Sequence, residues 1–103
     1  MIGVPPSLPG APTITRTTPK PGQKVKVTLA SGSDGGSPVT RYEVSCSAKG
    51  GAKTRTATGT RTSLTVTKLT KGKKYRCRAR AANAVGTGPW GKAGKKVLVA
   101  RRD

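Results

Sequence analysis

The sequence predicts an all-β domain, a seven-stranded antiparallel β-sandwich, and three observations lead to this fold class. Apolar residues recur at every second position in short runs, which is the period of a strand with one buried face. Clusters of Gly, Pro, Ser and Asp separate the runs at intervals of about 8–12 residues, a spacing typical of a β-sandwich. No stretch has apolar residues at the 3.6-residue period of an amphipathic helix.

The first three strands are marked by different features. Residues 13–18 are rich in threonine, whose branched side chain favours an extended backbone. In the segment 24–29 every second residue is Val or Leu, and two lysines occupy alternate positions. The segment 42–46 places Tyr, Val and Cys on one face. The turn-forming residues 31–38, rich in Gly and Ser, separate these last two segments.

The remaining four strands follow in the second half of the chain. In residues 53–58 every second residue is a threonine, and residues 63–67 place one Leu and one Val on the same face. The segment 75–81 has the clearest alternation, because every second residue is an arginine. The segment 95–99 ends in Val-Leu-Val and is the last predicted strand.

Composition excludes several classes of function. The chain of 103 residues has 21 Lys and Arg against 3 Asp and Glu, a net charge of +18, and no His. Without His, the commonest general base and metal ligand is missing. No apolar run approaches the ~20 residues of a membrane-spanning helix. We therefore expect no catalytic site, no metal site, no cofactor and no membrane span.

Four segments carry a family resemblance. Residues 9–14 lead into the first strand, and residues 34–44 enter the third with Asp-Gly-Gly-Ser-Pro and Tyr-Glu-Val. Residues 69–75 have the pattern Leu-x-x-Gly-x-x-Tyr, and residues 81–90 have Asn-x-x-Gly-x-Gly-Pro-Trp. In order and spacing, residues 9–100 resemble the fibronectin type III family of immunoglobulin-like sandwiches, in the form repeated in secreted bacterial proteins.

The resemblance implies structural roles for several side chains. Tyr75 is expected to form a tyrosine corner, with its hydroxyl bonded to the backbone near Leu69. Gly72 is expected to adopt a turn conformation that a Cβ would penalise. Trp90 is expected to pack across one end of the domain, and the alternative is an exposed platform for stacking a sugar.

The resemblance also implies a pairing for the two cysteines. Cys46 and Cys77 lie in the third and sixth strands, which are antiparallel neighbours in this family. If they stand opposite each other, Val44 faces Ala79, so every inward residue meets another inward residue. A disulfide would stabilise a small core and would imply an oxidising setting. The alternative is a pair of buried free thiols.

The positive charge is expected to be distributed around the sandwich, with its densest stripe on the sheet that contains the sixth strand. In the same register the sixth strand directs arginines outward, Arg41 faces the same side from the third strand, and Glu43 stands opposite Arg80. The adjoining edge is expected to extend this surface. The candidate polyanion-binding residues are Arg41, Lys53, Arg55, Arg76, Arg78 and Arg80. A charge of +18 exceeds the ~2–8 that keeps a small domain soluble, so a partner is favoured over solubility alone.

That partner is expected to be an anionic polymer, such as an acidic glycan, or an acidic protein surface. Sequence-specific nucleic-acid recognition is not supported, because there is no recognition helix, no zinc module and no pair of aromatic residues on a strand.

The chain is expected to divide into three parts. Residues 1–10 form a Pro-rich arm or linker, residues 11–101 form the domain, and residues 102–103 are a tail. The first segment lacks the apolar core of a signal peptide. It is expected either to link this module to a longer secreted protein or to anchor it to an assembly. The candidate arm residues are Val4, Pro5, Pro6, Leu8 and Pro9.

Together these features predict a non-catalytic module with a structural, decorating or adhesive role. It would be displayed outside the cell, on a cell surface, or on a virion such as that of a bacteriophage. The alternatives are a spacer or adhesion repeat of a secreted bacterial protein and a non-specific nucleic-acid binder.

Overall fold

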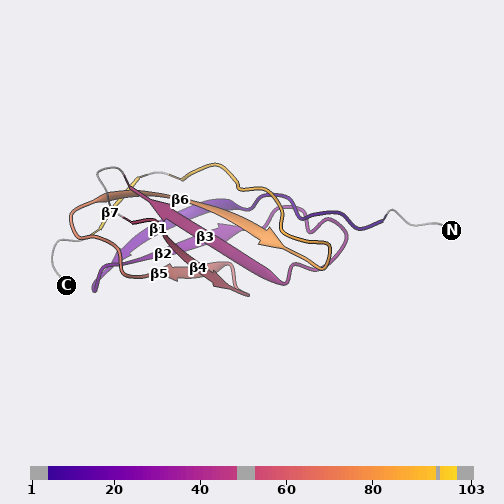
Figure 1. Cartoon of the computed structure of the whole chain (residues 1–103), viewed down its shortest axis with the longest axis horizontal. Coiled ribbons are helices and arrows are strands. Elements are labelled where there is room, and N and C mark those ends of the chain that lie inside the picture. Colours follow the sequence, from indigo (N-terminus) through magenta and orange to yellow (C-terminus); the bar gives the residue numbers. More distant parts are fainter. Residues whose placement is uncertain (1–4, 49–52, 95, 100–103) are drawn as a thin grey trace.

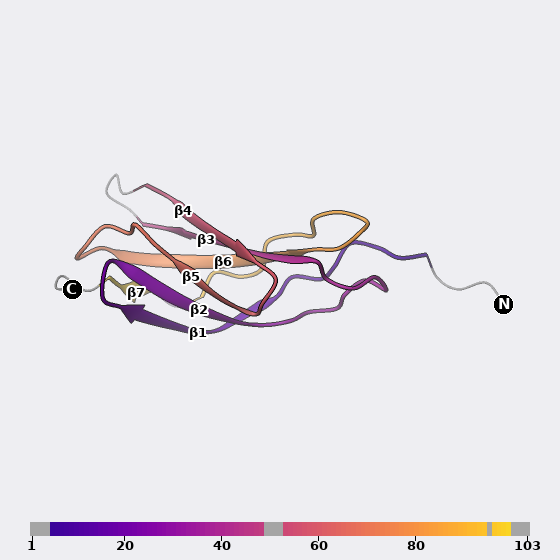
Figure 2. The ribbon, with the colours of Figure 1, turned by 90° about the horizontal axis from the view of Figure 1, so that it is seen from below.

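Two antiparallel sheets form the domain in the computed structural model, which describes residues 5–48, 53–94 and 96–99. The first sheet has the order β1-β2-β5 and contains β1 (Thr13–Lys20), β2 (Lys24–Ala30) and β5 (Ser63–Val66). The second has the order β4-β3-β6-β7 and contains β3 (Arg41–Ser47), β4 (Arg55–Gly59), β6 (Lys74–Ala82) and β7 (Val97–Leu98). Figures 1 and 2 show the strands from two sides and the sheets as stacked layers.

The structure confirms the predicted β-sandwich, and each of the seven strands overlaps its predicted segment. The largest difference is β7, which has two residues where five were expected, and Lys95 of that segment lies outside the described residues. In the described part of the chain there is no helix with the length and hydrophobicity needed to span a membrane.

The core consists of the alternate side chains that the two sheets direct toward each other. The first sheet contributes aliphatic side chains from β2 and β5, and the second contributes mostly Tyr, Cys and Ala from β3 and β6. The buried strand residues of β2, β3, β5 and β6 in this cluster are Val25, Val27, Leu29, Tyr42, Val44, Cys46, Leu64, Val66, Tyr75, Cys77, Ala79 and Ala81. Burial of alternate residues explains why the period-two pattern located these strands.

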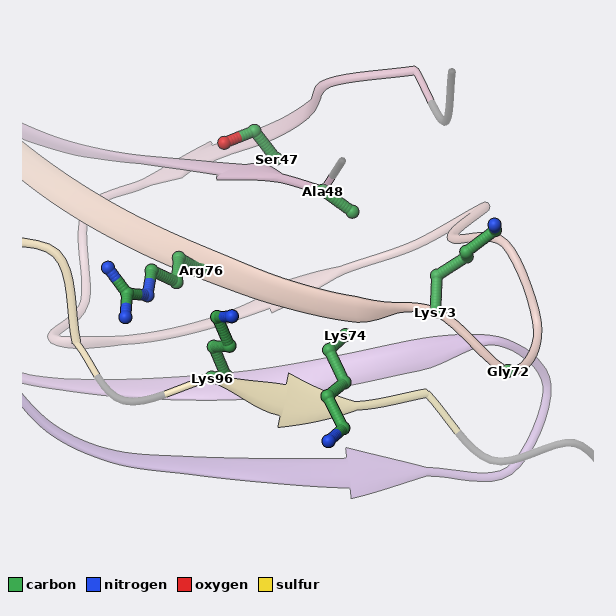
Figure 3. A pocket seen from close by; sticks show the side chains of 7 residues that line it. All are labelled: Ser47, Ala48, Gly72, Lys73, Lys74, Arg76 and Lys96. Atoms are coloured by element: carbon green, nitrogen blue, oxygen red, sulfur yellow. The ribbon is translucent and has the colours of Figure 1, made fainter. Parts of the chain in front are cut away.

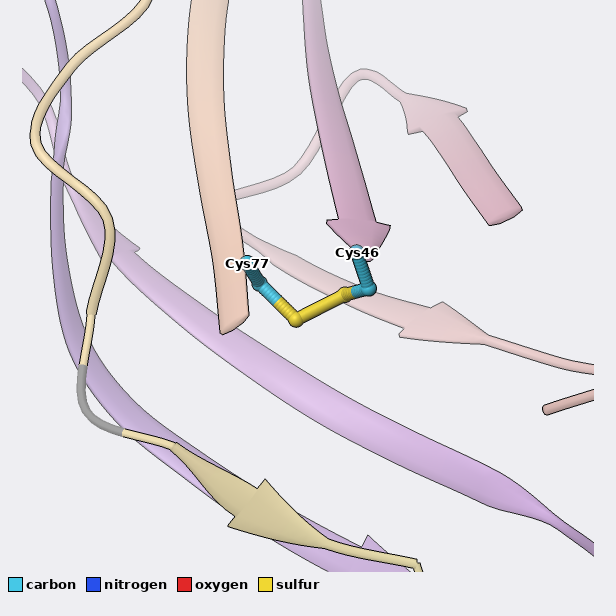
Figure 4. Close-up of a disulfide and its surroundings, with 2 residues drawn as sticks. All are labelled: Cys46 and Cys77. Carbon is cyan, nitrogen blue, oxygen red and sulfur yellow. A yellow bond between two sulfur atoms is a disulfide. The ribbon is translucent and has the colours of Figure 1, made fainter. Parts of the chain in front are cut away.

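A disulfide joins the two central strands of the second sheet. Cys46 of β3 is the direct register partner of Cys77 of β6, and Val44 is the partner of Ala79, which confirms the predicted register. Figure 4 shows the bond between the strands. Both cysteines are at most 1% exposed, so the bond lies within the core.

A tyrosine corner closes the turn before β6. The Tyr75 side chain is fully buried, and its hydroxyl accepts a hydrogen bond from the Thr70 N–H at 2.8 Å, one residue beyond Leu69. Gly72 has a φ of 76°, a left-handed conformation that favours glycine. Leu69 is also fully buried, so the turn is held by packing and by the hydroxyl together.

Replacing Tyr75 with Phe is expected to lower the free energy of unfolding by about 1–2 kcal/mol. The substitution keeps the buried ring and removes only the acceptor for the Thr70 N–H. Urea denaturation of the two proteins would measure the difference. The control is Tyr42→Phe, which removes the other tyrosine hydroxyl, a partner of the exposed Ser31. An unchanged stability of the Tyr75 variant would show that the corner hydrogen bond contributes nothing.

The connection from β6 to β7 runs along the edge of β6. The N–H groups of Gly88, Gly91 and Gly94 donate to backbone carbonyls of β6 at 2.8–2.9 Å. A Cβ on Gly88 would lie 2.2 Å from the Pro9 carbonyl oxygen, so only glycine fits where the N-terminal backbone crosses this segment. The connection is therefore fixed between β6 and the N-terminal segment.

The N-terminal segment is held at the end of the sandwich opposite the tyrosine corner. Ser7 N–H donates to the Gly35 carbonyl and Gly10 N–H donates to the Ser33 carbonyl, each at 2.8 Å. The buried Asn83 side chain donates to the Ser7 carbonyl at 2.8 Å. Ser7 and Gly10, both expected in the arm, are thus hydrogen-bonded to the domain. Figure 1 shows the N-terminal segment at this end of the sandwich.

Candidate anion-binding surface

The register of β3 and β6 places a row of arginines on the outer face of the second sheet. Arg76, Arg78 and Arg80 alternate with the buried residues of β6 and point away from the core. Their spacing along the strand is about 6.6–6.8 Å, because each is two residues from the next. Arg41 at the start of β3 is also exposed. These four predicted candidates therefore share one face of the sheet.

One carboxylate lies within this row. Glu43 is the register partner of Arg80, as the sequence predicts, and its Oε1 accepts a hydrogen bond from Arg80 Nε at 2.7 Å. The Glu43 side chain is 18% exposed and that of Arg80 is 33% exposed. The ion pair fixes the orientation of Arg80 and reduces the positive charge at this end of the row.

Trp90 packs against the same row. The guanidinium carbon of Arg80 lies 4.3 Å from the centroid of the Trp90 ring, and that of Arg78 lies 4.9 Å away. These distances fit cation–π contacts. The expectation that Trp90 packs across one end of the domain is therefore corrected: the hydrogen-bonded glycines on either side place it over β6. With two guanidinium groups against it, the ring is not an open platform for a sugar.

Arg55 does not belong to the cationic face, which is a correction of the sequence prediction. It is the register partner of Cys46, so it lies on the inward phase of β4. Its Nε donates to the Lys68 carbonyl at 3.1 Å, across the open edge between the sheets. Lys53 precedes β4 and is exposed. The segment from Arg55 to Gly59 contains no large apolar residue, so its sequence gave no sign of which side faces the core.

A groove with four cationic side chains lies at the other end of the arginine row. Its volume is about 580 Å³, and Figure 3 shows its lining from β3, β6 and the segment before β7. The lining residues are Ser47, Ala48, Gly72, Lys73, Lys74, Arg76 and Lys96. We call this the basic groove. None of its lining residues is acidic, and none of its cations has an ion-pair partner among the described residues.

Strand pairing explains how the basic groove forms. Ser47 is the register partner of Arg76, and Lys74 is the partner of Leu98. If the pairing of β6 with β7 is continued by one more residue pair beyond Tyr75 and Val97, Lys96 lies opposite Arg76, on the side of β6 away from Ser47. Three of the four cations, Lys73, Lys74 and Lys96, were not among the candidates from the sequence. The sequence shows them as basic residues, but their meeting depends on the pairing of β6 with β7.

The described carboxylates both have structural partners. Asp34 Oδ1 accepts a hydrogen bond from the Gly36 N–H at 2.8 Å and so stabilises its own turn, and Glu43 binds Arg80. Among the described residues no group of three His, Cys, Asp or Glu side chains could hold a metal ion.

The candidate arm residues have different environments. Pro9 is fully buried against its own domain, so it is not available to a partner, which corrects its assignment. Pro5 and Pro6 are exposed, and Leu8 is 46% exposed. Val4 lies outside the described residues.

The chain has recognisable similarity to known domains. A family model for the fibronectin type III domain matches residues 10–96. A crystal structure of titin domains superposes with a TM-score of 0.82 and 22% identity, over 92% of this chain and 33% of that one. The twitchin kinase region from C. elegans gives a TM-score of 0.72 and 26% identity, over 93% of this chain and 17% of that one. The solution structure of a human fibronectin type III domain gives a TM-score of 0.74 and 20% identity, over 96% of this chain and 85% of that one.

The chain thus spans a third or less of the length of the titin and twitchin structures. None of the curated protein sequences matches it.

Proposed function

Because the chain belongs to the fibronectin type III family, we propose that it is a non-catalytic structural or adhesion module that contacts an anionic partner through the outer face of its second sheet. Domains of this family are typically structural or adhesive. The partner is an acidic glycan or an acidic protein surface. The module is displayed outside the cell, on a cell surface or on a larger assembly such as a bacteriophage virion.

The observation that carries the proposal is the distribution of charge on that face. Arg41, Arg76 and Arg78 are exposed on it, while its one described carboxylate is already bound to Arg80. A net charge of +18 on 103 residues repels itself in the folded state. An anionic partner would relieve that repulsion and bind with strong salt dependence.

Two features support display on a surface or assembly. The buried disulfide is of a kind that forms and persists in oxidising environments. Pro5, Pro6 and Leu8 are exposed beside the anchored residues, so they are available to dock on a larger assembly. The virion setting follows by analogy from similar sandwiches that decorate virions.

A second candidate is a spacer or adhesion repeat of a longer secreted bacterial protein. The similarity to domains that occupy only 33% and 17% of longer chains favours it. A non-specific nucleic-acid binder is less well supported, because the described aromatic residues are buried or covered by arginines.

The test is a binding titration of the intact protein against duplex DNA, an acidic polysaccharide and a neutral polysaccharide. We expect binding to the acidic polysaccharide that weakens steeply between about 50 and 200 mM salt, and none to the neutral one. Absence of binding to the acidic polysaccharide at low salt would exclude an acidic glycan as the partner and leave only an acidic protein surface. Tighter binding to duplex DNA than to the polysaccharide would instead favour the nucleic-acid alternative.

A further inference from the structure

We infer that the basic groove is the anchoring subsite for the partner and that it binds sulfate or phosphate ester groups of an acidic glycan. This inference rests on the proposed function and assigns it to Arg76, the first arginine of the row, together with three lysines that the row does not include. The groove differs from the rest of the face because four basic residues line one hollow and have no ion-pair partner among the described residues, whereas Arg78 and Arg80 are engaged with Trp90 and Glu43.

The charges around the groove favour an anion strongly. Arg76 lies at its centre in the sheet, Ser47 is opposite it on β3, and Lys96 reaches toward it from the segment before β7 (Figure 3). Lys74 follows along β6, and Lys73 contributes from the turn. Like charges held together without a counter-charge destabilise the fold, and a bound anion removes that repulsion.

The donors present indicate which anionic group fits. Each lysine has three donors and Arg76 has a planar fork of five, and the four side chains extend in different directions from the turn, from β6 and from the segment before β7 (Figure 3). A phosphate group offers three strong acceptor oxygens, and a sulfate ester has the same tetrahedral arrangement. A carboxylate has only two oxygens in one plane. The tetrahedral ester therefore satisfies donors from more directions.

The size and lining of the groove indicate a glycan as the carrier of that group. Its volume of about 580 Å³ lies within the ~300–1,000 Å³ range of small-ligand pockets, so this open groove has room for a sugar unit with its ester. None of the described residues that line it is aromatic, so these residues offer a nucleic-acid base no surface for stacking. Tyr42 and Tyr75 are in the core and Trp90 packs against arginines.

The test compares two double variants that remove the same charge. Lys74→Gln with Lys96→Gln removes two cations of the basic groove. Lys24→Gln with Lys26→Gln removes two exposed cations from β2 on the other sheet and is the matched control. Each variant is titrated with a sulfated heparin hexasaccharide, a phosphorylated mannan oligosaccharide, a hyaluronan hexasaccharide that carries only carboxylates, and single-stranded oligothymidylate. Unfolding of each variant by urea confirms that it is folded.

We expect the groove variant to lose affinity for the preferred ester-bearing oligosaccharide by about tenfold or more, since it lacks two charged hydrogen-bond donors. The control variant is expected to lose about threefold or less of its affinity, because it changes only the overall positive charge. The sulfated and phosphorylated probes distinguish the two sources of the ester.

Equal losses in the two variants would overturn the groove as the subsite while leaving the proposed function intact. Hyaluronan or oligothymidylate binding as tightly as either ester-bearing oligosaccharide would overturn the ligand class. If the wild-type protein bound none of the four probes, the groove proposal would fail together with the acidic glycan as the partner in the proposed function.

Discussion

Replacing both Cys46 and Cys77 with alanine is expected to lower the free energy of unfolding by about 3–4 kcal/mol. The disulfide joins residues 31 positions apart, and without it the unfolded chain regains the conformations that the closed loop excludes. A loss of this size corresponds to a fall in Tm of about 15 °C or more for a domain of this length. Thermal unfolding of the two proteins under identical conditions would measure it.

Reducing agent provides the control for the disulfide. A reductant is expected to bring the melting temperature of the wild-type protein down toward that of the double variant, and to leave the variant unchanged. Because both cysteines are at most 1% exposed, we expect reduction to require prior unfolding. If the oxidised wild type and the variant melted within a few degrees of each other, the bond would not be a major source of stability.

Replacing Asn83 with alanine is expected to have the second large effect, lowering the free energy of unfolding by about 2–4 kcal/mol. The Asn83 side chain donates to the Ser7 and Asp34 carbonyls, each at 2.8 Å. Its Oδ1 accepts hydrogen bonds from the N–H groups of Val85 and Gly86. One buried amide thus ties the N-terminal segment, the β2–β3 loop and the β6–β7 loop together, and alanine leaves four backbone groups without their partner.

Two further variants make the Asn83 prediction specific. Asn83→Asp keeps an acceptor for the two N–H groups but places negative charge against the two carbonyl oxygens. We therefore expect it to lower the free energy of unfolding at least as much as alanine does. Thr87→Ala, at an exposed position in the same loop, is expected to change stability by only about 0.5 kcal/mol. Urea denaturation would measure all three, and an Asp variant as stable as wild type would show that the donated hydrogen bonds are dispensable.

The central part of the sheet was predictable because inward and outward residues alternate without interruption in β3 and β6. That alternation allowed a register in which Glu43 meets Arg80 and Cys46 meets Cys77, and the structure has this register. A shift by one residue would have directed arginines into the core and cysteines into solvent. Alternation therefore fixed which side chains face the core, and the choice of this register rested on the cysteine pairing that the family resemblance implies.

Other parts of the candidate site could not be predicted because no local pattern marks them. Arg55 lies in a segment of small and polar residues, so only the pairing with β3 shows that it is on the inward phase. Trp90 could have stacked at the domain end, on a sugar or on arginines. Its place follows from backbone hydrogen bonds between the glycines beside it and β6.

By itself, the sequence determined the sandwich, the strand positions and the arginine row, because each follows from a period-two pattern under the requirement that apolar side chains be buried. The cysteine pairing followed from the neighbouring strands that the family resemblance implies. Only the tertiary structure decided that Pro9 is buried in its own domain, that Trp90 covers Arg78 and Arg80, and that Lys96 joins Arg76 in one groove. These contacts join segments far apart in the chain through loop geometry and strand order, which no local alternation of polar and apolar residues records.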